Sequence, residues 1–356
     1  MKHINMTNAL LLGLLAIMPA VYGADAPVAE SQGKVALKGW PSAVQKVRYM
    51  STADNTLQPT LFYKPAGAKP VPLLVALHTW SGDYLQPEPA YAKWCIAKGW
   101  AFVHPNFRGP NKTPEACGSE LVVKDIISAV EYAKQNANID PDRIYLVGGS
   151  GGAYAAMLLA GRAPQLWAGV SAWCGIFDLR DWYKQTSVRK LNYATMMESS
   201  CGGVPGTSAE VDAQFRARSA SAYLSKAKGV PVDLNTGIFD GHKGSVPTSQ
   251  SLEAFNCLAS PGDRLSAADI AFITKQAKIP DALKKEINDP LYSRCKALLR
   301  KTSGNTRVTV FEGGHDMLFE AAFAWLEQQR KGKPAVWDVP ALSGVDLKGQ
   351  LIEVGK

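Results

Sequence analysis

The sequence predicts an α/β fold with a mostly parallel central sheet and helices on both faces of that sheet. Three observations lead to this prediction. Strand-like and helix-like segments alternate along most of the chain, several strand-like segments are uninterrupted apolar runs, and about 330 residues remain after a short targeting segment. Apolar runs of this kind are typical of strands that are buried on both faces. Their alternation with helices is typical of a parallel sheet within one large domain.

The first residues have the pattern of a secretory signal peptide. Lys2 and His3 precede an apolar run over residues 9–21, and small residues follow at Gly23 and Ala24. The run is short for a membrane-spanning helix, which favours a signal peptide at residues 1–23 over the alternative of a membrane anchor. We therefore expect a mature domain of residues 24–356 that is secreted or periplasmic, with no membrane association after cleavage.

Two hydrophobicity patterns predict the strands. Residues 44–49 and 60–63 alternate between apolar and polar positions, as strands with one solvated face do. Residues 72–77 form an uninterrupted apolar run before His78, as expected for a strand inside a parallel sheet. In chain order, the expected strands are 44–49, 60–63, 72–77, 100–103, 143–147, 168–172, 232–239 and 307–311, the last two of these closing the sheet.

Helices are predicted where apolar residues recur with the helical period. Within residues 120–136 the apolar positions fall on one face of a helix, and they are Val122, Ile126, Ile127, Val130 and Ala133. Residues 317–329 show a similar pattern, with Phe319, Ala322, Trp325 and Leu326 facing inward. In chain order, the expected helices are 91–98, 120–136, 153–160 and 317–329.

Two long stretches, 178–228 and 257–302, do not follow the alternation of strands and helices. We interpret both as insertions that cover the edge of the sheet where binding loops collect. A lid over a binding site and a packed structural addition are alternatives that the sequence leaves equally open.

The charge of the chain does not indicate a nucleic-acid partner. The net charge is +8, and only short basic pairs such as Lys284–Lys285 and Arg330–Lys331 occur. No basic stripe is interleaved with aromatic residues, as a nucleic-acid surface requires. A basic surface attracts acidic polysaccharides over a long range, but an ordinary solvated surface explains the same charge. The oligomeric state stays open.

All six cysteines follow the predicted signal peptide. They are Cys95, Cys117, Cys174, Cys201, Cys257 and Cys295. An even number in an exported chain predicts at least one disulfide, although the pairing cannot be read from the sequence. Buried free thiols are the alternative. No CxxC pair occurs, which argues against zinc binding and thioredoxin-type chemistry. We expect neither a metal site nor a cofactor.

The chemistry of the chain is indicated first by the motif G-x-S-x-G at Gly148–Gly152. A predicted buried strand ends at Val147, and a helical pattern begins at Ala153. This context is typical of a strained strand-to-helix turn that exposes a nucleophilic serine. Gly148 and Gly152 leave space for neighbouring backbone. The sequence therefore predicts Ser150 as a nucleophile, and an inert serine in a glycine-rich turn is the alternative.

A serine nucleophile needs a base, and His315 has the position expected for it. It lies between the last predicted strand and the last predicted helix, and the chain order serine, acid, histidine places the base there. His78 ends the strand at 72–77 and begins a loop that fits the second oxyanion donor. We expect the backbone N–H groups of Trp80 and Gly151 to form the oxyanion hole, with His78 as a structural hydrogen-bonding residue.

Several segments give the chain a resemblance to one known branch of enzymes. They are the elbow at Gly148–Gly152, Asn106–Gly109, Val246–Pro247 and Gly314–His315. From about Leu73 to Leu326, the chain resembles the prolyl oligopeptidase-like branch of the α/β-hydrolase superfamily. The resemblance implies the α/β-hydrolase fold and acyl transfer by a serine nucleophile.

The acid of the expected triad is the least certain member. In the resembled branch it commonly stands three residues before the Val-Pro pair, which is Lys243 here, and lysine cannot orient an imidazolium. Asp240 lies at the end of the penultimate predicted strand, and we take it as the acid. A turn-capping role is the alternative for Asp240. Asp233 and Asp316 are weaker candidates.

Three further residues are candidates for substrate binding. Arg108 follows a strand at the same edge of the sheet and suits a substrate carboxylate or carbonyl, with a structural ion pair as the alternative. Trp173 and Trp182, together with Trp80, suit stacking on a sugar or aryl group, with core packing as the alternative.

Together these patterns predict a secreted serine hydrolase that cleaves carboxylic esters, with acyl groups on plant polysaccharides as candidate substrates. Peptidases of the resembled branch usually carry a propeller domain. Only roughly 50 residues separate the signal peptide from the first central strand, too few for a propeller. A secreted peptidase and a binding protein that has lost catalysis are the alternatives, the second because the acid is displaced.

Overall fold

The computed structural model describes residues 1, 37–340 and 352–353. The expected signal peptide therefore lies outside the described residues, apart from Met1. Within the described part of the chain, no helix combines the length and apolar character needed to cross a lipid bilayer.

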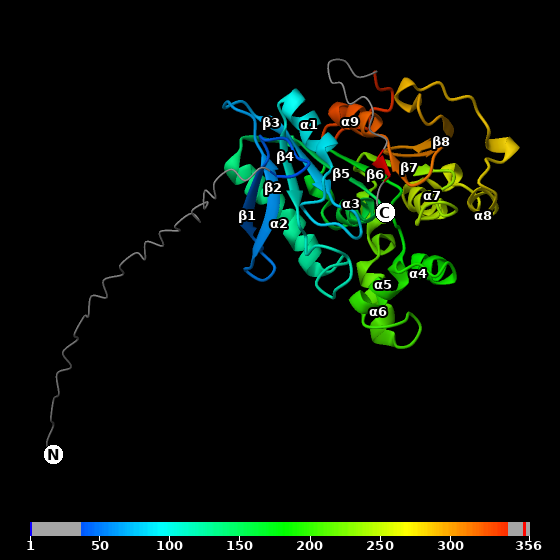
Figure 1. Ribbon diagram of the computed structural model, residues 1–356, viewed down its shortest axis with the longest axis horizontal. Coiled ribbons are helices and arrows are strands. Elements are labelled where there is room, and N and C mark those ends of the chain that lie inside the picture. Colours follow the sequence, from blue (N-terminus) through cyan, green and yellow to red (C-terminus); the bar gives the residue numbers. More distant parts are fainter. Residues whose placement is uncertain (2–36, 341–351, 354–356) are drawn as a thin grey trace. The chain divides into compact units, whose positions relative to one another are not determined.

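One sheet organises the described residues (Figure 1). Its strands are β1 (Gln45–Met50), β2 (Leu57–Tyr63), β3 (Val71–Leu77), β4 (Ala101–Pro105), β5 (Ile139–Gly149), β6 (Gly169–Trp173), β7 (Val232–Gly237), β8 (Ala297–Ser303) and β9 (Thr306–Phe311). They lie in the order β1-β2-β4-β3-β5-β6-β7-β9-β8. The strands from β4 to β9 in this order pair in parallel. Antiparallel pairs occur only at the two edges of this sheet, so the expected mostly parallel sheet is confirmed.

Helices cover both faces of the sheet. They are α1 (Pro89–Lys98), α2 (Glu120–Asn136), α3 (Gly151–Arg162), α4 (Leu179–Val188), α5 (Tyr193–Cys201), α6 (Ala209–Arg218), α7 (Ser249–Leu258), α8 (Ala267–Gln276) and α9 (Phe319–Gln328). Because successive side chains of a strand point to opposite faces, β3 contributes to two cores. Leu73, Val75 and Leu77 pack with α2, α3 and α7, whereas Leu74 and Ala76 pack with α1 and α9.

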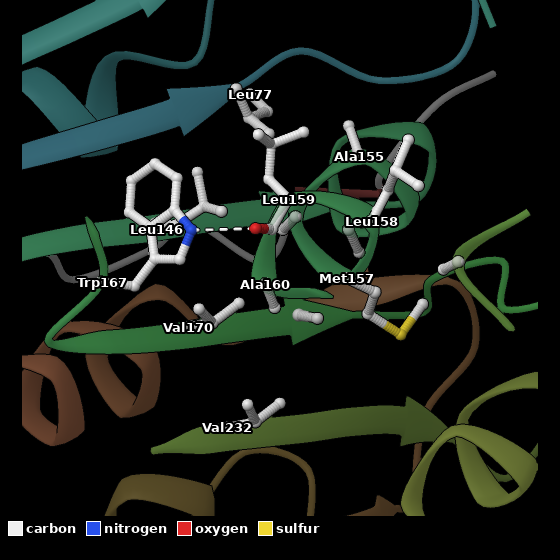
Figure 2. Packing of buried hydrophobic residues seen from close by; sticks show 14 of the residues in the cluster. Leu77, Leu146, Ala155, Met157, Leu158, Leu159, Ala160, Trp167, Val170 and Val232 are labelled. Carbon is white, nitrogen blue, oxygen red and sulfur yellow. Dashed lines mark hydrogen bonds between the residues drawn. The ribbon is translucent and has the colours of Figure 1, made fainter. Parts of the chain in front are cut away.

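The elbow helix α3 is packed tightly into the first of these cores. Figure 2 shows its apolar residues beside Leu146 of β5, Val170 of β6 and Val232 of β7. The indole Nε1 of Trp167 donates a hydrogen bond of 3.0 Å to the carbonyl oxygen of Leu159, near the end of the helix. Burial on this scale fixes α3 and therefore the turn that precedes it.

Two sequence predictions about the strands need correction. The strand expected at 232–239 ends at Gly237, and an additional strand, β8, comes between β7 and β9 in the sequence and forms the edge of the sheet beside β9. Half-buried Arg300 and Lys301 interrupt the apolar pattern of β8, because an edge strand has fewer neighbours to bury it. Beyond the main sheet, β10 (Asp316–Met317) pairs with β11 (Ile352–Glu353) in antiparallel fashion.

The two predicted insertions have different structures. Residues 178–228 form α4, α5 and α6, which contact one another; we call this segment the α4–α6 insertion. Its Trp182 packs edge-on against Trp80 at 4.7 Å between ring centroids, so the insertion lies beside the expected oxyanion loop. Within 257–302, Ile270 and Ile273 of α8 join the core around α7.

Candidate active site

Ser150 occupies a strained turn at the carboxyl end of the central strand β5. Its backbone angles are φ 55° and ψ −122°, and α3 begins at the next residue. A positive φ in a residue with a Cβ atom is uncommon and costs energy, so the surrounding packing has to impose it. Ser150 N–H donates to Trp173 O at 2.8 Å, which fastens the turn to β6.

The glycines on either side of Ser150 lie very close to the backbone of other residues. A Cβ atom at Gly148 would lie 2.4 Å from the carbonyl carbon of Gly152, and one at Gly151 would lie 2.3 Å from the backbone nitrogen of Trp80. Side chains are therefore excluded at both positions. The second contact places the amide of Trp80 next to the residue that follows Ser150, which is the arrangement an oxyanion hole requires.

The loop that carries Trp80 is held from several sides. Asn111 donates two hydrogen bonds to Trp80 O, from its backbone N–H at 2.9 Å and from its side-chain Nδ2 at 3.2 Å. Among the described residues, no atom accepts a hydrogen bond from the Trp80 N–H. His78 lies stacked on Phe107 with 3.8 Å between ring centroids, and its two ring nitrogens face backbone carbonyl oxygens. His78 thus occupies a structural position.

A series of side-chain hydrogen bonds extends from the same loop to Glu88. Gln86 Oε1 accepts hydrogen bonds from the N–H and the hydroxyl of Thr79, and Gln86 Nε2 donates to Glu88 Oε1 at 3.3 Å. Glu88 Oε2 is buried and has no hydrogen-bond partner among the described residues. Burial raises the pKa of Glu88 from 4.5 to about 7, and the hydrogen bond from Gln86 opposes this shift.

Asp240 and His315 meet at the carboxyl edge of the sheet. Asp240 Oδ2 lies 2.6 Å from His315 Nδ1. Asp240 Oδ1 accepts hydrogen bonds from Gly241 N–H at 2.9 Å and from Val246 N–H at 3.1 Å. The acid loop is a tight turn after β7, and the histidine loop follows the neighbouring parallel strand β9. The contact therefore follows from the pairing of these two strands.

The other carboxylates considered for this role are engaged elsewhere. Asp233 forms a buried ion pair with Arg307 at 2.8 Å. Asp316 Oδ2 accepts a hydrogen bond from Gly314 N–H within its own turn. Neither carboxylate makes a hydrogen bond to His315 among the described residues, and Lys243 lies exposed over the ring of Phe239.

The second ring nitrogen of His315, Nε2, is left without a partner by the residues that the structure describes. Nε2 is buried and makes no hydrogen bond within the described residues, so the structure contains no hydrogen bond between Ser150 and His315. A buried nitrogen left unpaired costs free energy and marks a position open to a proton donor. Catalytic hydrogen bonds are often long before substrate binds.

The α4–α6 insertion holds the acid loop, a role that the sequence did not reveal. Trp182 Nε1 donates to Ser245 O at 3.0 Å, and Arg189 donates through Nη2 to Gly244 O at 2.7 Å. Both acceptors are backbone carbonyls, which any residue provides, so no sequence signal marks these contacts.

Cys174 is a further residue that the sequence analysis did not place at the site. Its Sγ lies 3.4 Å from Asp316 O, and it is within 4.8 Å of side-chain atoms of both Asp240 and His315. Burial, followed by the charge of Asp240, raises the pKa of this thiol well above its usual range. The protonated thiol can therefore donate weakly to the loop oxygens. The sequence feature that could have identified Cys174 is its position directly after β6.

Three candidate substrate-binding residues have other partners. The guanidinium of Arg108 is bound by Asp125 at 2.6 Å and by Asp54 at 2.8 Å, so the ion-pair alternative describes it. Trp173 is fully buried and packs on Tyr292 and Phe311. Trp182 is 1% exposed. Neither indole lies open for stacking on a ligand, because the sheet buries the first and the α4–α6 insertion buries the second.

Comparisons with known proteins agree with this architecture. A sequence profile of the prolyl oligopeptidase family matches residues 90–270. An acetylxylan esterase from Coprinopsis cinerea is 28% identical over 146 residues, which cover 37% of this chain and 39% of the esterase. An acylaminoacyl peptidase from Pyrococcus horikoshii superposes with a TM-score of 0.55 at 15% identity, covering 83% of this chain and 43% of the peptidase.

A puromycin-hydrolysing peptidase from Mycobacterium tuberculosis superposes with a TM-score of 0.51 at 15% identity, covering 80% of this chain and 39% of that protein. The chain thus matches less than half the length of each of these three relatives. At such identities, the two solved structures show a shared fold. Because the family profile covers half of the chain and the sheet is that of the superposed peptidases, the chain belongs to the prolyl oligopeptidase family and has the α/β-hydrolase fold.

Proposed function

We propose that this chain hydrolyses carboxylic esters through Ser150, His315 and Asp240. The observation that carries the proposal is the 2.6 Å contact between Asp240 Oδ2 and His315 Nδ1. It lies at the same edge of the sheet as the strained turn at Ser150. A carboxylate at Nδ1 fixes the tautomer in which Nε2 can accept a proton.

Each group then has one task. Ser150 Oγ attacks the ester carbonyl carbon while His315 Nε2 takes the hydroxyl proton, and Asp240 stabilises the imidazolium that forms. The N–H groups of Gly151 and Trp80 stabilise the oxyanion. His315 gives its proton to the leaving alkoxide, which departs as an alcohol. Water then attacks the acyl group on Ser150 with His315 again as the base, which releases the acid and restores the serine.

The low exposure of the catalytic side chains supports a short acyl group. Ser150 is 6% exposed and His315 is 8% exposed. Trp80, Trp182 and Val246 form one buried cluster beside them. A bulky feruloyl group would have to displace these aromatic side chains, whereas an acetyl group requires little room. The partial match to an acetylxylan esterase supports the same class, and we propose acetylated polysaccharide as the substrate.

A secreted peptidase is the second candidate function, because the matching family is named for a peptidase and both superposed structures are peptidases. A role in binding alone has less support. A protein that only binds has no need for a carboxylate buried against His315.

Substrate classes can be separated with one panel assayed on the wild type and on Ser150→Ala. The panel contains p-nitrophenyl acetate, p-nitrophenyl hexanoate, acetylated xylan, feruloylated arabinoxylan and a proline-containing peptide amide. We expect release of acetate from xylan and faster turnover of the acetyl than of the hexanoyl ester. Faster cleavage of the peptide amide would replace the esterase proposal with the peptidase. No Ser150-dependent turnover of any substrate would favour the binding role.

We also propose that the chain is exported, on the basis of its first 23 residues. Amino-terminal sequencing of the protein recovered outside the cytoplasm of its native cell tests this. A first residue at or near Ala24 supports cleavage, and an intact Met1 in a cytoplasmic protein contradicts it.

A further inference from the structure

Two buried thiols face each other between the β4–α2 loop (residues 106–119) and the α4–α6 insertion. Cys117 belongs to the loop, and Cys201 is the last residue of α5. They are 0% and 3% exposed and belong to one apolar cluster with Trp80 and Trp182. Interaction between the two thiols lowers the pKa of Cys117 and raises that of Cys201, as expected for neighbouring side chains of one cluster. In the described part of the chain, no other two cysteines influence each other's pKa.

The surroundings of Cys117 favour its thiolate. Burial raises the pKa of Cys117, but the neighbouring Cys201 thiol, the charge of Arg218 and the hydroxyls of Tyr154 and Ser200 together outweigh burial, so that the net pKa is lowered. Arg218 Nη1 donates to Ala116 O at 2.8 Å and to Cys117 O at 3.3 Å, which holds its guanidinium beside this residue. The thiolate is the reactive form in thiol–disulfide exchange, so Cys117 is the attacking sulfur and Cys201 the resolving one.

We propose that Cys117 and Cys201 form a disulfide that fastens the α4–α6 insertion to the β4–α2 loop. All six cysteines carry free thiols in this structure. Closing the bond brings the two sulfur atoms to about 2.0 Å from each other. The inference goes beyond the proposed ester hydrolysis and does not depend on it.

The oxidant is a small disulfide such as oxidised glutathione. The Cys117 thiolate attacks one sulfur of the small disulfide, forming a mixed disulfide and releasing one thiolate. Cys201 then loses its proton and attacks the Cys117 sulfur, which expels the second thiolate. Two protein thiols are oxidised to one disulfide, and one small disulfide is reduced to two thiols. Because both sulfurs are buried in the native fold, the exchange takes place late in folding, when Cys201 and Arg218 are already near Cys117 and the small disulfide can still reach the sulfurs.

The bond would also stiffen the loop that carries Trp80. Asn111 Oδ1 accepts a hydrogen bond from Cys117 N–H at 2.9 Å, while the same residue donates to Trp80 O. Ser200, beside Cys201, donates to Asn111 O at 3.5 Å. The disulfide therefore links the insertion to a loop that holds Trp80 in place.

Refolding of the wild-type chain, with no substitution, tests the proposal. The reduced, unfolded full chain is refolded in a mixture of oxidised and reduced glutathione, its free thiols are alkylated without reduction, and its peptides are mapped by mass spectrometry. We expect one linked pair, Cys117 with Cys201, and alkylation of the other four cysteines. The oxidised protein should also melt about 5 °C or more above the reduced protein.

Two variants serve as matched controls. Cys257→Ser should keep both the linked peptide and the higher melting temperature, because Cys257 is half-buried and away from the pair. Cys201→Ser should lose both and melt near the reduced wild type. The proposal is overturned if natively folded wild type has both cysteines alkylated. It is equally overturned if either cysteine is linked to a different partner.

Discussion

Asp240 Oδ2 lies 2.6 Å from His315 Nδ1, although the two residues are 75 positions apart in the chain. The other carboxylate oxygen accepts two backbone hydrogen bonds, from Gly241 and Val246. With both oxygens held, the carboxylate is fixed in position and in turn fixes the plane and tautomer of the imidazole.

Replacing Asp240 by asparagine should lower turnover of p-nitrophenyl acetate by about 10⁴-fold, because an amide stabilises the wrong tautomer and cannot stabilise an imidazolium. The fold should be retained, since the two side chains have the same shape. Steady-state kinetics with circular dichroism as a check of folding provide the measurement. Asp316→Asn is the matched control and should lose less than about tenfold, because its carboxylate accepts a hydrogen bond from Gly314 within its own turn. Activity that survives Asp240→Asn but disappears in Asp316→Asn would reverse the assignment.

Ser150→Ala should abolish ester hydrolysis and labelling by a fluorophosphonate probe, while leaving the melting temperature unchanged or raised. The positive φ at Ser150 is strained in both residues, and only the attacking hydroxyl is removed. Ser199→Ala is the control, because this hydroxyl bonds an exposed helix carbonyl on α5. Intact protein mass after probe treatment reads the label directly. A labelled Ser150→Ala protein would mean that another residue is the nucleophile.

Gly244→Ala should reduce kcat by at least about tenfold, because a Cβ atom there would lie 2.2 Å from Asp240 Oδ1 and 2.6 Å from His315 Cβ. The methyl group has to push the acid and the base apart. Gly229→Ala is the control, since a Cβ atom at that position meets nothing within 4 Å. Kinetics on both variants test the effect. Equal activity of the two variants would show that the acid loop can shift without cost to the reaction.

The stability of the protein should fall as the pH rises from about 4.5 to about 7, because of Glu88. Its pKa is raised by burial to about 7 in the folded chain, against 4.5 as its ordinary value. Between these values the folded state binds a proton that the unfolded state lacks. The contribution of Glu88 is therefore fully present below pH 4.5 and is lost as the pH rises through 7, by an amount on the order of 3 kcal/mol.

Urea unfolding across this pH range measures the effect of Glu88. Glu88→Gln should flatten the curve in this window, whereas Glu286→Gln, at an exposed position, should follow the wild type. If the wild type and Glu88→Gln lose the same free energy of unfolding between pH 5 and pH 8, Glu88 does not hold a proton in the folded chain.

Much of the fold could be predicted from local patterns. The helix at 120–136 and the strand before Ser150 follow from the spacing of apolar residues, and the glycine-rich turn at Gly148–Gly152 follows from its own residues. These features depend on neighbours along the chain. Strand β8 was missed because its edge position leaves residues such as Lys301 half-exposed, which weakens the pattern on which the prediction relies.

The partners of individual side chains were decided by the tertiary structure. The sequence left three aspartates as candidates beside His315, and the pairing of β7 with β9 brings Asp240 to it. It also left substrate binding open as a role for Arg108 and Trp182. In the structure, Arg108 forms an ion pair with Asp125, and Trp182 packs against Trp80. A local pattern reports burial and backbone conformation, because adjacent residues determine these. Which two side chains meet depends on how elements far apart in the chain pack, and no single segment carries that information.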